Sequence, residues 1–255
     1  METVIEVANL TKRFNGQVAV DGISMRVRRG EFLGFLGPNG AGKTTTIGML
    51  LGIVAPTAGT VRILGRPMPR ERQAILMRVN FSSPYVTMPH ALSAWENLLV
   101  FAHLYLVPQP RARIQALAER FGVAHLLHRP VRALSSGEAA RVNLVKAFLN
   151  DPEVLFLDEP TASLDPEAAD TVRAHLRTLQ RERGLTIFYT SHNMSEVERL
   201  STRIVFLHRG RIIADGPPAE VLRATRHATL EEFFLALARS GAPAGGEDAG
   251  RRTAS

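Results

Sequence analysis

The chain has 255 residues, of which 45% are hydrophobic and 22% are charged, and its formal net charge is +7. This composition is ordinary for a soluble globular protein, and the length suits one large domain, with or without a subdomain. The chain contains no cysteine, which excludes disulfides and thiolate metal sites. The positive charge alone does not separate a nucleic acid, an anionic membrane surface or an acidic partner from a plain solvated surface.

The sequence predicts neither a membrane span nor a secretory signal. Its longest apolar run, Leu98–Val107, is interrupted by His103 and has about half of the roughly 20 residues that a spanning helix needs. The opening segment Met1–Glu6 carries acidic residues where a secretory signal would carry bases. We therefore expect any role at a membrane to depend on a partner.

The N-terminal part predicts short antiparallel strands, then a buried strand and a helix. Apolar residues recur in Val4–Val7 and alternate in Val18–Val27, with a turn at Asn15–Gly16 between them. Glu31–Leu36 is a short apolar run followed by a glycine, which is typical of a strand buried on both faces. Apolar residues at helical spacing then predict a helix over Thr44–Gly52.

The middle of the chain, residues 83–150, predicts an inserted helical subdomain. Ser93 and Glu96 have the spacing of a capping box and precede an apolar run. Two prolines then separate this first helix from a second one over Ile114–Phe121.

After residue 150, strands and helices alternate, which indicates a parallel sheet with helices on its faces. We expect strands over residues 154–157, 186–190 and 203–207, and helices over residues 166–181 and 194–200. Arg209–Gly210 predicts a hairpin turn to a further strand. The last residues, 240–255, are rich in glycine and alanine without apolar periodicity, so we expect a disordered tail.

A phosphate-binding loop is the strongest motif. Gly37–Thr44 matches G-x-x-x-x-G-K-[ST] between the expected strand and the expected helix, which is the context that this loop requires. Its glycines let backbone N–H groups curl toward phosphate oxygens, and the helix adds its positive end. Lys43 would neutralise the β- and γ-phosphates of ATP, and the Thr44 hydroxyl would bind Mg²⁺. The residues expected at the nucleotide are Gly37, Pro38, Asn39, Gly40, Ala41, Gly42, Lys43, Thr44 and Thr45.

Two acidic residues end the apolar strand that begins at Val154. Asp158 is suited to hold Mg²⁺ directly or through water, and Glu159 to polarise the attacking water as a general base. In isolation the same pair would be explained as a cap on the turn before Pro160. The phosphate-binding loop upstream favours the metal ligand and the base.

Two further motifs have a structural interpretation beside a functional one. His192 follows a strand whose end shares the sheet edge with the phosphate-binding loop, so it could bond the γ-phosphate or be an ordinary satisfied polar group. Ser135 and Glu138 again have capping-box spacing, which alone would explain them. Their functional interpretation is a second helix N-terminus aimed at phosphate.

In this order and spacing, the motifs resemble the nucleotide-binding domain of ABC (ATP-binding cassette) transporters. The resemblance covers about residues 2–238, and its most specific element is Leu-Ser-x-Gly-x at residues 134–138, which other P-loop ATPases lack. It implies an α/β fold: a P-loop NTPase core with a mostly parallel sheet flanked by helices, an N-terminal antiparallel β region and the inserted helical subdomain.

The resemblance also implies roles for single residues. Phe14 stands where the family stacks an aromatic residue, more commonly tyrosine, on adenine. Ser135 and Gly137 would contact the γ-phosphate bound to the opposite subunit, so that two copies sandwich two ATP molecules, and Asp165 would lie at that interface. The catalytic base and the switch histidine would be Glu159 and His192.

The family further implies transmembrane permease subunits as partners, a second copy of the ATP-binding subunit, and a location at the cytoplasmic face of the membrane. Thr190–Val197 and Leu230–Leu237 look like bacterial cassettes that work with export permeases. The alternative is a soluble ABC-type ATPase acting on nucleic acid or ribosomes. Such proteins generally carry two cassettes or a long coiled-coil insertion, whereas this chain has one phosphate-binding loop, so we expect no direct nucleic-acid contact.

Three positions depart from the family pattern. Ser136 and Glu138 replace its usual glycine and glutamine, and both suit a helix cap. Pro84 stands where a glutamine is usual, which puts the contribution of that glutamine to Mg²⁺ in doubt. For docking of the permease, the sequence predicts an exposed rim around Tyr85 and Met88.

Overall fold

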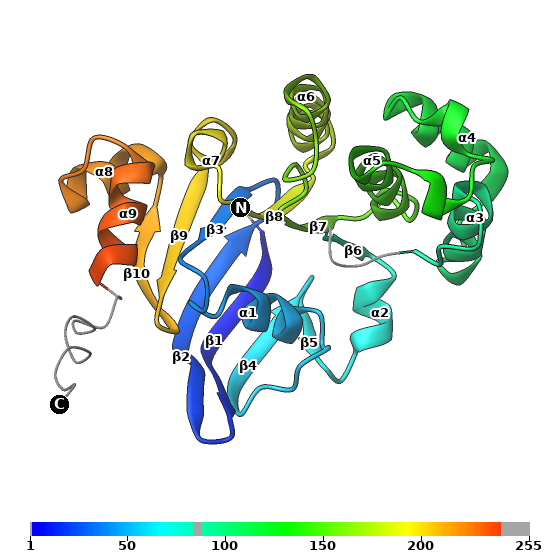
Figure 1. The fold of residues 1–255 in the computed structure, drawn as a ribbon. Coiled ribbons are helices and arrows are strands. Elements are labelled where there is room, and N and C mark those ends of the chain that lie inside the picture. The colour runs from blue at the N-terminus through cyan, green and yellow to red at the C-terminus, as the bar shows by residue number, and fades with distance from the viewer. Residues whose placement is uncertain (1, 84–87, 241–255) are drawn as a thin grey trace, which may run out of the picture.

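The computed structural model describes residues 2–83 and 88–240, and its strands form two sheets (Figure 1). The smaller sheet has the order β2-β1-β4-β5 and the larger one the order β10-β9-β3-β8-β7-β6. The smaller sheet consists of β1 (Thr3–Phe14), β2 (Gln17–Arg28), β4 (Ala58–Ile63) and β5 (Arg66–Met68). The larger sheet consists of β3 (Phe32–Leu36), β6 (Val79–Ser82), β7 (Val154–Asp158), β8 (Thr186–Thr190), β9 (Arg203–His208) and β10 (Arg211–Gly216).

The smaller sheet is antiparallel, as the sequence predicts. The β1–β2 turn has positive φ at both Asn15 and Gly16, the geometry that asparagine and glycine tolerate best in a tight hairpin. Both strands are 12 residues long, so the prediction of short strands is wrong. Register shifts along the pair interrupt the alternation of side chains, which is why a period-two pattern breaks into short runs.

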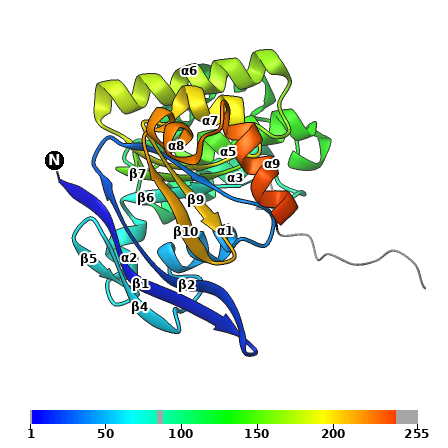
Figure 2. The ribbon, with the colours of Figure 1, turned by 90° about the vertical axis from the view of Figure 1, so that its left-hand side faces the viewer.

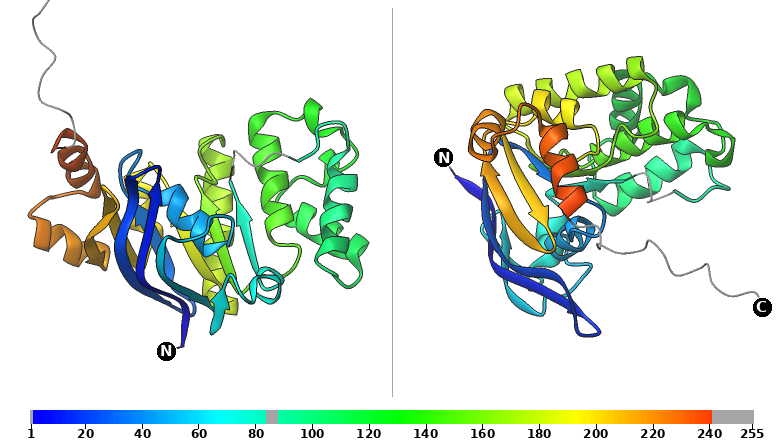
Figure 3. Two further views of the ribbon diagram at one scale, coloured as in Figure 1. Left: turned by 90° about the horizontal axis from the view of Figure 1, so that it is seen from below. Right: turned by 60° about the vertical axis from the view of Figure 1, so that its left-hand side comes forward.

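In the larger sheet, the strands from β9 to β6 run parallel to one another, and only β10, which pairs with β9, is antiparallel. The helices are α1 (Lys43–Leu50), α2 (Arg72–Leu76), α3 (Ala94–Leu104), α4 (Pro110–Arg120), α5 (Ser136–Ala147), α6 (Pro166–Arg183), α7 (Met194–Leu200), α8 (Pro218–Thr225) and α9 (Leu230–Ser240), with the 3₁₀ turns η1 (Ala124–Leu126) and η2 (Val131–Ala133). The α/β architecture of the prediction is therefore confirmed. Helices α3–α5 lie together beyond β6, at one end of the sheet (Figures 1 and 3).

In Figure 2 the larger sheet lies between helices, among them α6 and α7, on one side and α1 with the smaller sheet on the other. A hydrophobic core fills the space on each side. On β3, Leu33 and Phe35 belong to the core shared with α1, α2 and the smaller sheet, whereas Phe32 and Leu36 belong to the core shared with α3–α9. Burying each such side chain contributes roughly 1.5–3 kcal/mol. Because both faces of the central strands are covered, the loops at their ends start from fixed positions.

The segment before α3 differs from the prediction of an exposed docking rim. Met88 is only 2% exposed and packs in the same core as Leu98, so this part of the prediction is wrong. The Asn97 side chain donates a hydrogen bond to the Pro89 carbonyl at 3.1 Å, which holds the segment against α3. Pro84 and Tyr85 lie outside the described residues. Of the predicted tail, residue 240 is the last residue of α9, and residues 241–255 lie outside the described residues.

Candidate nucleotide-binding site

The predicted site residues meet at one edge of the larger sheet. Strands β3, β8 and β7 are consecutive neighbours and run parallel, so their carboxyl ends lie side by side. The phosphate-binding loop follows β3, His192 follows β8, Asp158 is the last residue of β7 and Glu159 follows it. Ligands of open parallel sheets bind at this kind of edge.

Glycine is required at two positions of the loop. Gly37 has φ 150° and Gly42 has φ 106°, conformations that residues with a side chain rarely adopt. A Cβ at Gly37 would clash with the Leu207 carbonyl oxygen, and one at Gly42 with the Ala19 carbonyl oxygen. The loop is therefore wedged between β9 and β2, and α1 begins immediately after it with no acidic residue in its first turn. Its first N–H groups are suited to an anion.

Lys43 bridges this loop. Its Nζ donates to the carbonyl oxygens of Gly37 at 2.6 Å and Pro38 at 3.1 Å. Burial lowers the pKa of the lysine, while the carboxylates of Glu159 and Asp158 oppose that shift. The ammonium group is thus partly dehydrated and close to two acids. A phosphate entering the loop would meet a cation whose charge is only weakly screened by water.

Asp158 is buried at the end of β7, and its Oδ1 accepts a hydrogen bond from the Thr190 hydroxyl at 2.5 Å. This bond orients the carboxylate from the neighbouring strand. The Thr44 side chain is exposed in the first turn of α1. A carboxylate and a hydroxyl are the oxygen ligands that Mg²⁺ accepts, and few protein ligands suffice when phosphates supply the others. The two residues therefore fit a magnesium site.

Glu159 is held by His192 in an unusual conformation. Its φ is +52°, in the left-handed region that a non-glycine residue occupies only where its surroundings enforce it. The His192 ring Nε2 lies 3.2 Å from one carboxylate oxygen, and the His192 backbone N–H donates to the other at 3.2 Å. Burial raises the pKa of Glu159, and His192 opposes the shift. A carboxyl with a raised pKa is a better proton acceptor near neutral pH.

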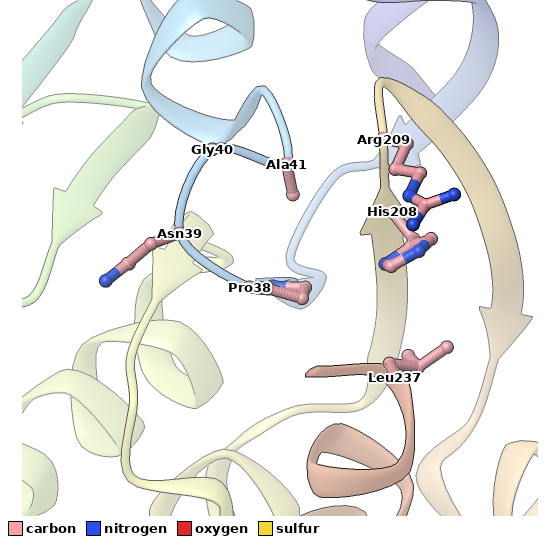
Figure 4. Close-up of a pocket in the computed structure, with 7 residues that line it drawn as sticks. All are labelled: Pro38, Asn39, Gly40, Ala41, His208, Arg209 and Leu237. Atoms are coloured by element: carbon pink, nitrogen blue, oxygen red, sulfur yellow. The ribbon is translucent and has the colours of Figure 1, made fainter. Parts of the chain in front are cut away.

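The C-terminal helix α9 reaches this edge, which the sequence did not predict. A cavity of about 180 Å³ lies between the phosphate-binding loop, the β9–β10 turn and Leu237 on α9 (Figure 4). Phe234 on the same helix meets the His192 ring edge-on, with centroids 6.5 Å apart. The apolar spacing within Leu230–Leu237 is the signal that could have predicted a packed helix here.

Comparison with known proteins agrees with this geometry. Residues 20–162 match the family profile described as "ABC transporter". The chain is 40% identical over 235 residues to the "Nod factor export ATP-binding protein I" of Paraburkholderia xenovorans (strain LB400), covering 91% of this chain and 77% of that protein. The chain belongs to the ABC transporter family. It is an ABC transporter ATP-binding subunit, and its predicted membership is confirmed.

Other relatives of this ABC subunit agree. It is 38% identical to the "Uncharacterized ABC transporter ATP-binding protein YhcH" of Bacillus subtilis (strain 168), covering 84% of this chain and 70% of that protein. Among solved structures, a "Structure of ATP binding subunit of ABC transporter" superposes with a TM-score of 0.86 at 28% identity, over 92% of this chain and all of that one. The bacterial ABC transporter cassette MJ0796 has the same fold, with a TM-score of 0.79 at 23% identity, over 84% of this chain and 98% of that one.

The Leu-Ser-x-Gly-x segment of this ABC subunit begins α5 with an exposed capping box. The Ser135 hydroxyl accepts from the Glu138 N–H at 3.2 Å, and the Glu138 carboxylate accepts from the Ser135 N–H at 2.7 Å. Within residues 2–83 and 88–240, no hydrogen-bond acceptor meets the N–H groups of Ser136 and Gly137. Nor does a hydrogen bond link this segment to the phosphate-binding loop in the same range. The N–H groups of Ser136 and Gly137 are therefore suited to an anion, and no hydrogen bond joins them to the phosphate-binding loop within the described residues.

The remaining predicted residues, Phe14 and Asp165, belong to elements other than β3, β7 and β8. Phe14 is the last residue of β1 and is 46% exposed, and the Lys12 ammonium lies 4.7 Å from the centroid of its ring. Asp165 caps α6 by accepting from the Ala168 N–H at 2.9 Å. Their roles at adenine and at a dimer interface stay predictions. In the part of the chain that the structure covers, no helix has the length and apolar character to cross a membrane.

Proposed function

We propose that this ABC subunit binds ATP with Mg²⁺, hydrolyses it, and thereby drives export through a separate membrane permease. The observation that carries the proposal is the convergence of Lys43, Asp158 and the Glu159–His192 pair at one sheet edge. A cation for phosphate, a carboxylate for metal and a proton acceptor are the groups that phosphoryl transfer to water needs.

Each residue has a distinct part in the reaction. The loop amides and Lys43 bind the phosphates, and Thr44 and Asp158 would hold Mg²⁺, which supplies neutralising charge when bound. Glu159 accepts a proton from the attacking water, because its carboxylate is buried and its pKa is raised. His192 orients that carboxylate through its ring and its backbone N–H, and would bond the γ-phosphate.

A second copy of the chain would complete the site. The open N–H groups of Ser136 and Gly137, with the exposed Ser135 hydroxyl, are suited to the γ-phosphate of ATP bound to the other copy. A two-fold dimer satisfies both sites at once, because the same pair of surfaces meets twice. Asp165 and Phe14 would then lie at the interface and on adenine, respectively.

The direction of transport rests on relatives. The Paraburkholderia protein is named for Nod factor export, and this chain is 40% identical to it over 235 residues. Export through a transmembrane permease, with the subunit peripheral at the cytoplasmic face, follows by analogy.

The test replaces Lys43 with alanine and titrates a fluorescent ATP analogue. We expect binding to weaken about 10- to 100-fold, because hydrogen bonds to charged groups contribute roughly 1.5–3 kcal/mol. Arg111→Ala, which removes an exposed cation on α4, should bind as the wild type does. Equal binding by the Lys43 and Arg111 variants, or no ATP-dependent phosphate release by the wild type, would refute the proposal.

A further inference from the structure

A small cavity lies between α5 and the turn that begins with Glu159. Its volume is about 10 Å³, which is close to the least that accommodates one water molecule. Helix α5 forms one wall, and the end of β6 and the turn after β7 form the others. The lining includes Ser82, Ser83, Ala140, Asn143, Glu159 and Pro160.

Asn143 is the polar side chain that α5 contributes to this cavity. It is only 7% exposed, and in the part of the chain that the structure describes no donor meets its amide oxygen Oδ1. Its neighbours Val142 and Leu144 are fully buried in the hydrophobic core, so the amide is a polar exception on the inner part of the helix. A buried carbonyl oxygen without a donor is costly. We therefore expect the molecule that occupies the cavity to supply the donor.

Water fits both the size and the chemistry of this cavity. A buried water usually makes two to four hydrogen bonds to polar groups. The lining offers the amide oxygen of Asn143, which only accepts, the residue Ser82, whose hydroxyl both donates and accepts, and the acid Glu159. A volume of about 10 Å³ leaves no room for an organic group, and the charge of Glu159 disfavours an anion.

The turn that begins with Glu159 is held by hydrogen bonds from the side of β8 and α7. The Glu159 N–H donates to the Thr190 carbonyl of β8 at 3.1 Å, and the Thr161 hydroxyl donates to the buried Glu196 carboxylate of α7 at 3.0 Å. Toward α5, within the described residues, no hydrogen bond joins residues 159–165 to the helix. A water molecule bonded to Asn143 would supply a polar link on that side.

We propose that Asn143 is a positioning residue for ATP hydrolysis: its Oδ1 accepts a hydrogen bond from one water molecule in this cavity, and that water holds the turn of Glu159 against α5. The proposal rests on the proposed function, since Glu159 is the base of that reaction. With contacts on both sides, the turn keeps the carboxylate in place while it accepts a proton. Small displacements of a reacting group slow the chemical step strongly. The phosphate-binding loop does not depend on this turn, so nucleotide binding is unaffected.

The first experiment compares Asn143→Val with Asn143→Thr. The two new side chains have the same shape, and only threonine keeps an oxygen that bonds water. We expect Asn143→Val to lower kcat for phosphate release about tenfold, and Asn143→Thr to keep at least about a third of the wild-type kcat. Both variants should bind a fluorescent ATP analogue as the wild type does and unfold at similar temperatures. Equal kcat values of the two variants would overturn the proposal, because a merely structural asparagine would affect both alike.

The second experiment keeps Asn143 and removes the space for the water. Ala140→Val adds two methyl groups at the wall of the cavity, one helical turn before Asn143, and should also lower kcat about tenfold without changing ATP binding. Ala116→Val, at an exposed position of α4, has the same helix-propensity cost and should keep the wild-type rate. A normal kcat for Ala140→Val would overturn the role of the water.

A crystal structure of the whole chain locates the molecule in the cavity directly. We expect a water oxygen at hydrogen-bond distance from Asn143 Oδ1 in the wild type, and none there in Asn143→Val. A donor supplied by the protein itself, including one from residues 84–87, which lie outside the described residues, would overturn the proposal.

Phosphate release by the wild-type subunit separates the two proposals. A wild-type subunit that does not hydrolyse ATP disproves the proposed function, whatever the crystal structure shows in the cavity. An active wild type, with equal kcat values for Asn143→Val and Asn143→Thr, disproves the positioning role of Asn143 alone.

Discussion

Helices α3 and α5 begin with the same capping box, yet their surroundings differ. In both, the serine hydroxyl accepts from the N–H three residues on at 3.2 Å, and the glutamate accepts from the serine N–H at 2.7 Å. The sequence predicts both caps equally well, because Ser93–Glu96 and Ser135–Glu138 have the same spacing.

The difference lies in the next two amides. At α3, the N–H groups of Ala94 and Trp95 donate to the backbone carbonyls of Arg129 and Leu127. At α5, the corresponding groups of Ser136 and Gly137 meet no acceptor within the described residues. The backbone of another segment pairs with the amides of one helix end, whereas the amides of the other end have no acceptor within the described residues. A capping motif therefore specifies where a helix begins. Whether the first N–H groups of the helix can bind a ligand depends on whether another segment already pairs with them.

The largest expected effect is the loss of hydrolysis in Glu159→Gln, a variant that keeps ATP bound. In this ATP-bound variant, the starts of α3 and α5 can be compared. Glu159→Gln should lower the rate of phosphate release about 10²- to 10⁴-fold and leave ATP binding intact, because the amide keeps the shape but cannot accept the proton. Glu182→Gln, an exposed acid near the end of α6, is the matched control. Near-normal turnover by Glu159→Gln would show that Glu159 is not the general base.

The next effect separates the two caps directly. In the Glu159→Gln background, Ser135→Ala should weaken ATP-induced dimerisation about tenfold, because one hydrogen bond to the partner's γ-phosphate is lost. Ser93→Ala should leave dimerisation unchanged. Light scattering with and without ATP measures both variants. Equal effects of the two substitutions would show that the start of α5 is no more open to phosphate than that of α3.

Acid should inactivate the site before it affects the caps. Burial raises the pKa of Glu159 above 4.5, so lowering the pH protonates the base early. Hydrogen bonds from Ser93 and Ser135 lower the pKa values of Glu96 and Glu138, so the stability contributed by these carboxylates is lost only as the pH falls below 4.5. We expect ATPase activity to decline at a higher pH than helix content measured by circular dichroism. His192→Ala should move the activity decline further upward.

The smallest effect is the stability of the caps themselves. Ser93→Ala and Ser135→Ala should each lower the free energy of unfolding by about 1 kcal/mol, because each removes one N-cap hydroxyl of the same geometry. Urea denaturation of the two variants measures this. A difference well above 1 kcal/mol between them would mean that the caps are not structurally equivalent.

The sequence alone determined the local parts of this protein. The phosphate-binding loop, both capping boxes, the turns at Asn15–Gly16 and Arg209–Gly210 and the buried strands were all predictable. Each depends on residues within a few positions of one another, through positive φ, short-range hydrogen bonds or side-chain periodicity. The family followed from the order of these motifs.

Only the tertiary structure decided which groups stay open and which become buried. The amides at the start of α5, the burial of Met88 and Asn143, and the contact of α9 with His192 each involve segments far apart in the chain. A residue's burial depends on what the rest of the fold packs against it, which spacing along the sequence does not encode. For that reason the sequence could predict that Lys43, Asp158 and Glu159 lie near one another at one sheet edge, whereas it could not predict that Met88 is buried.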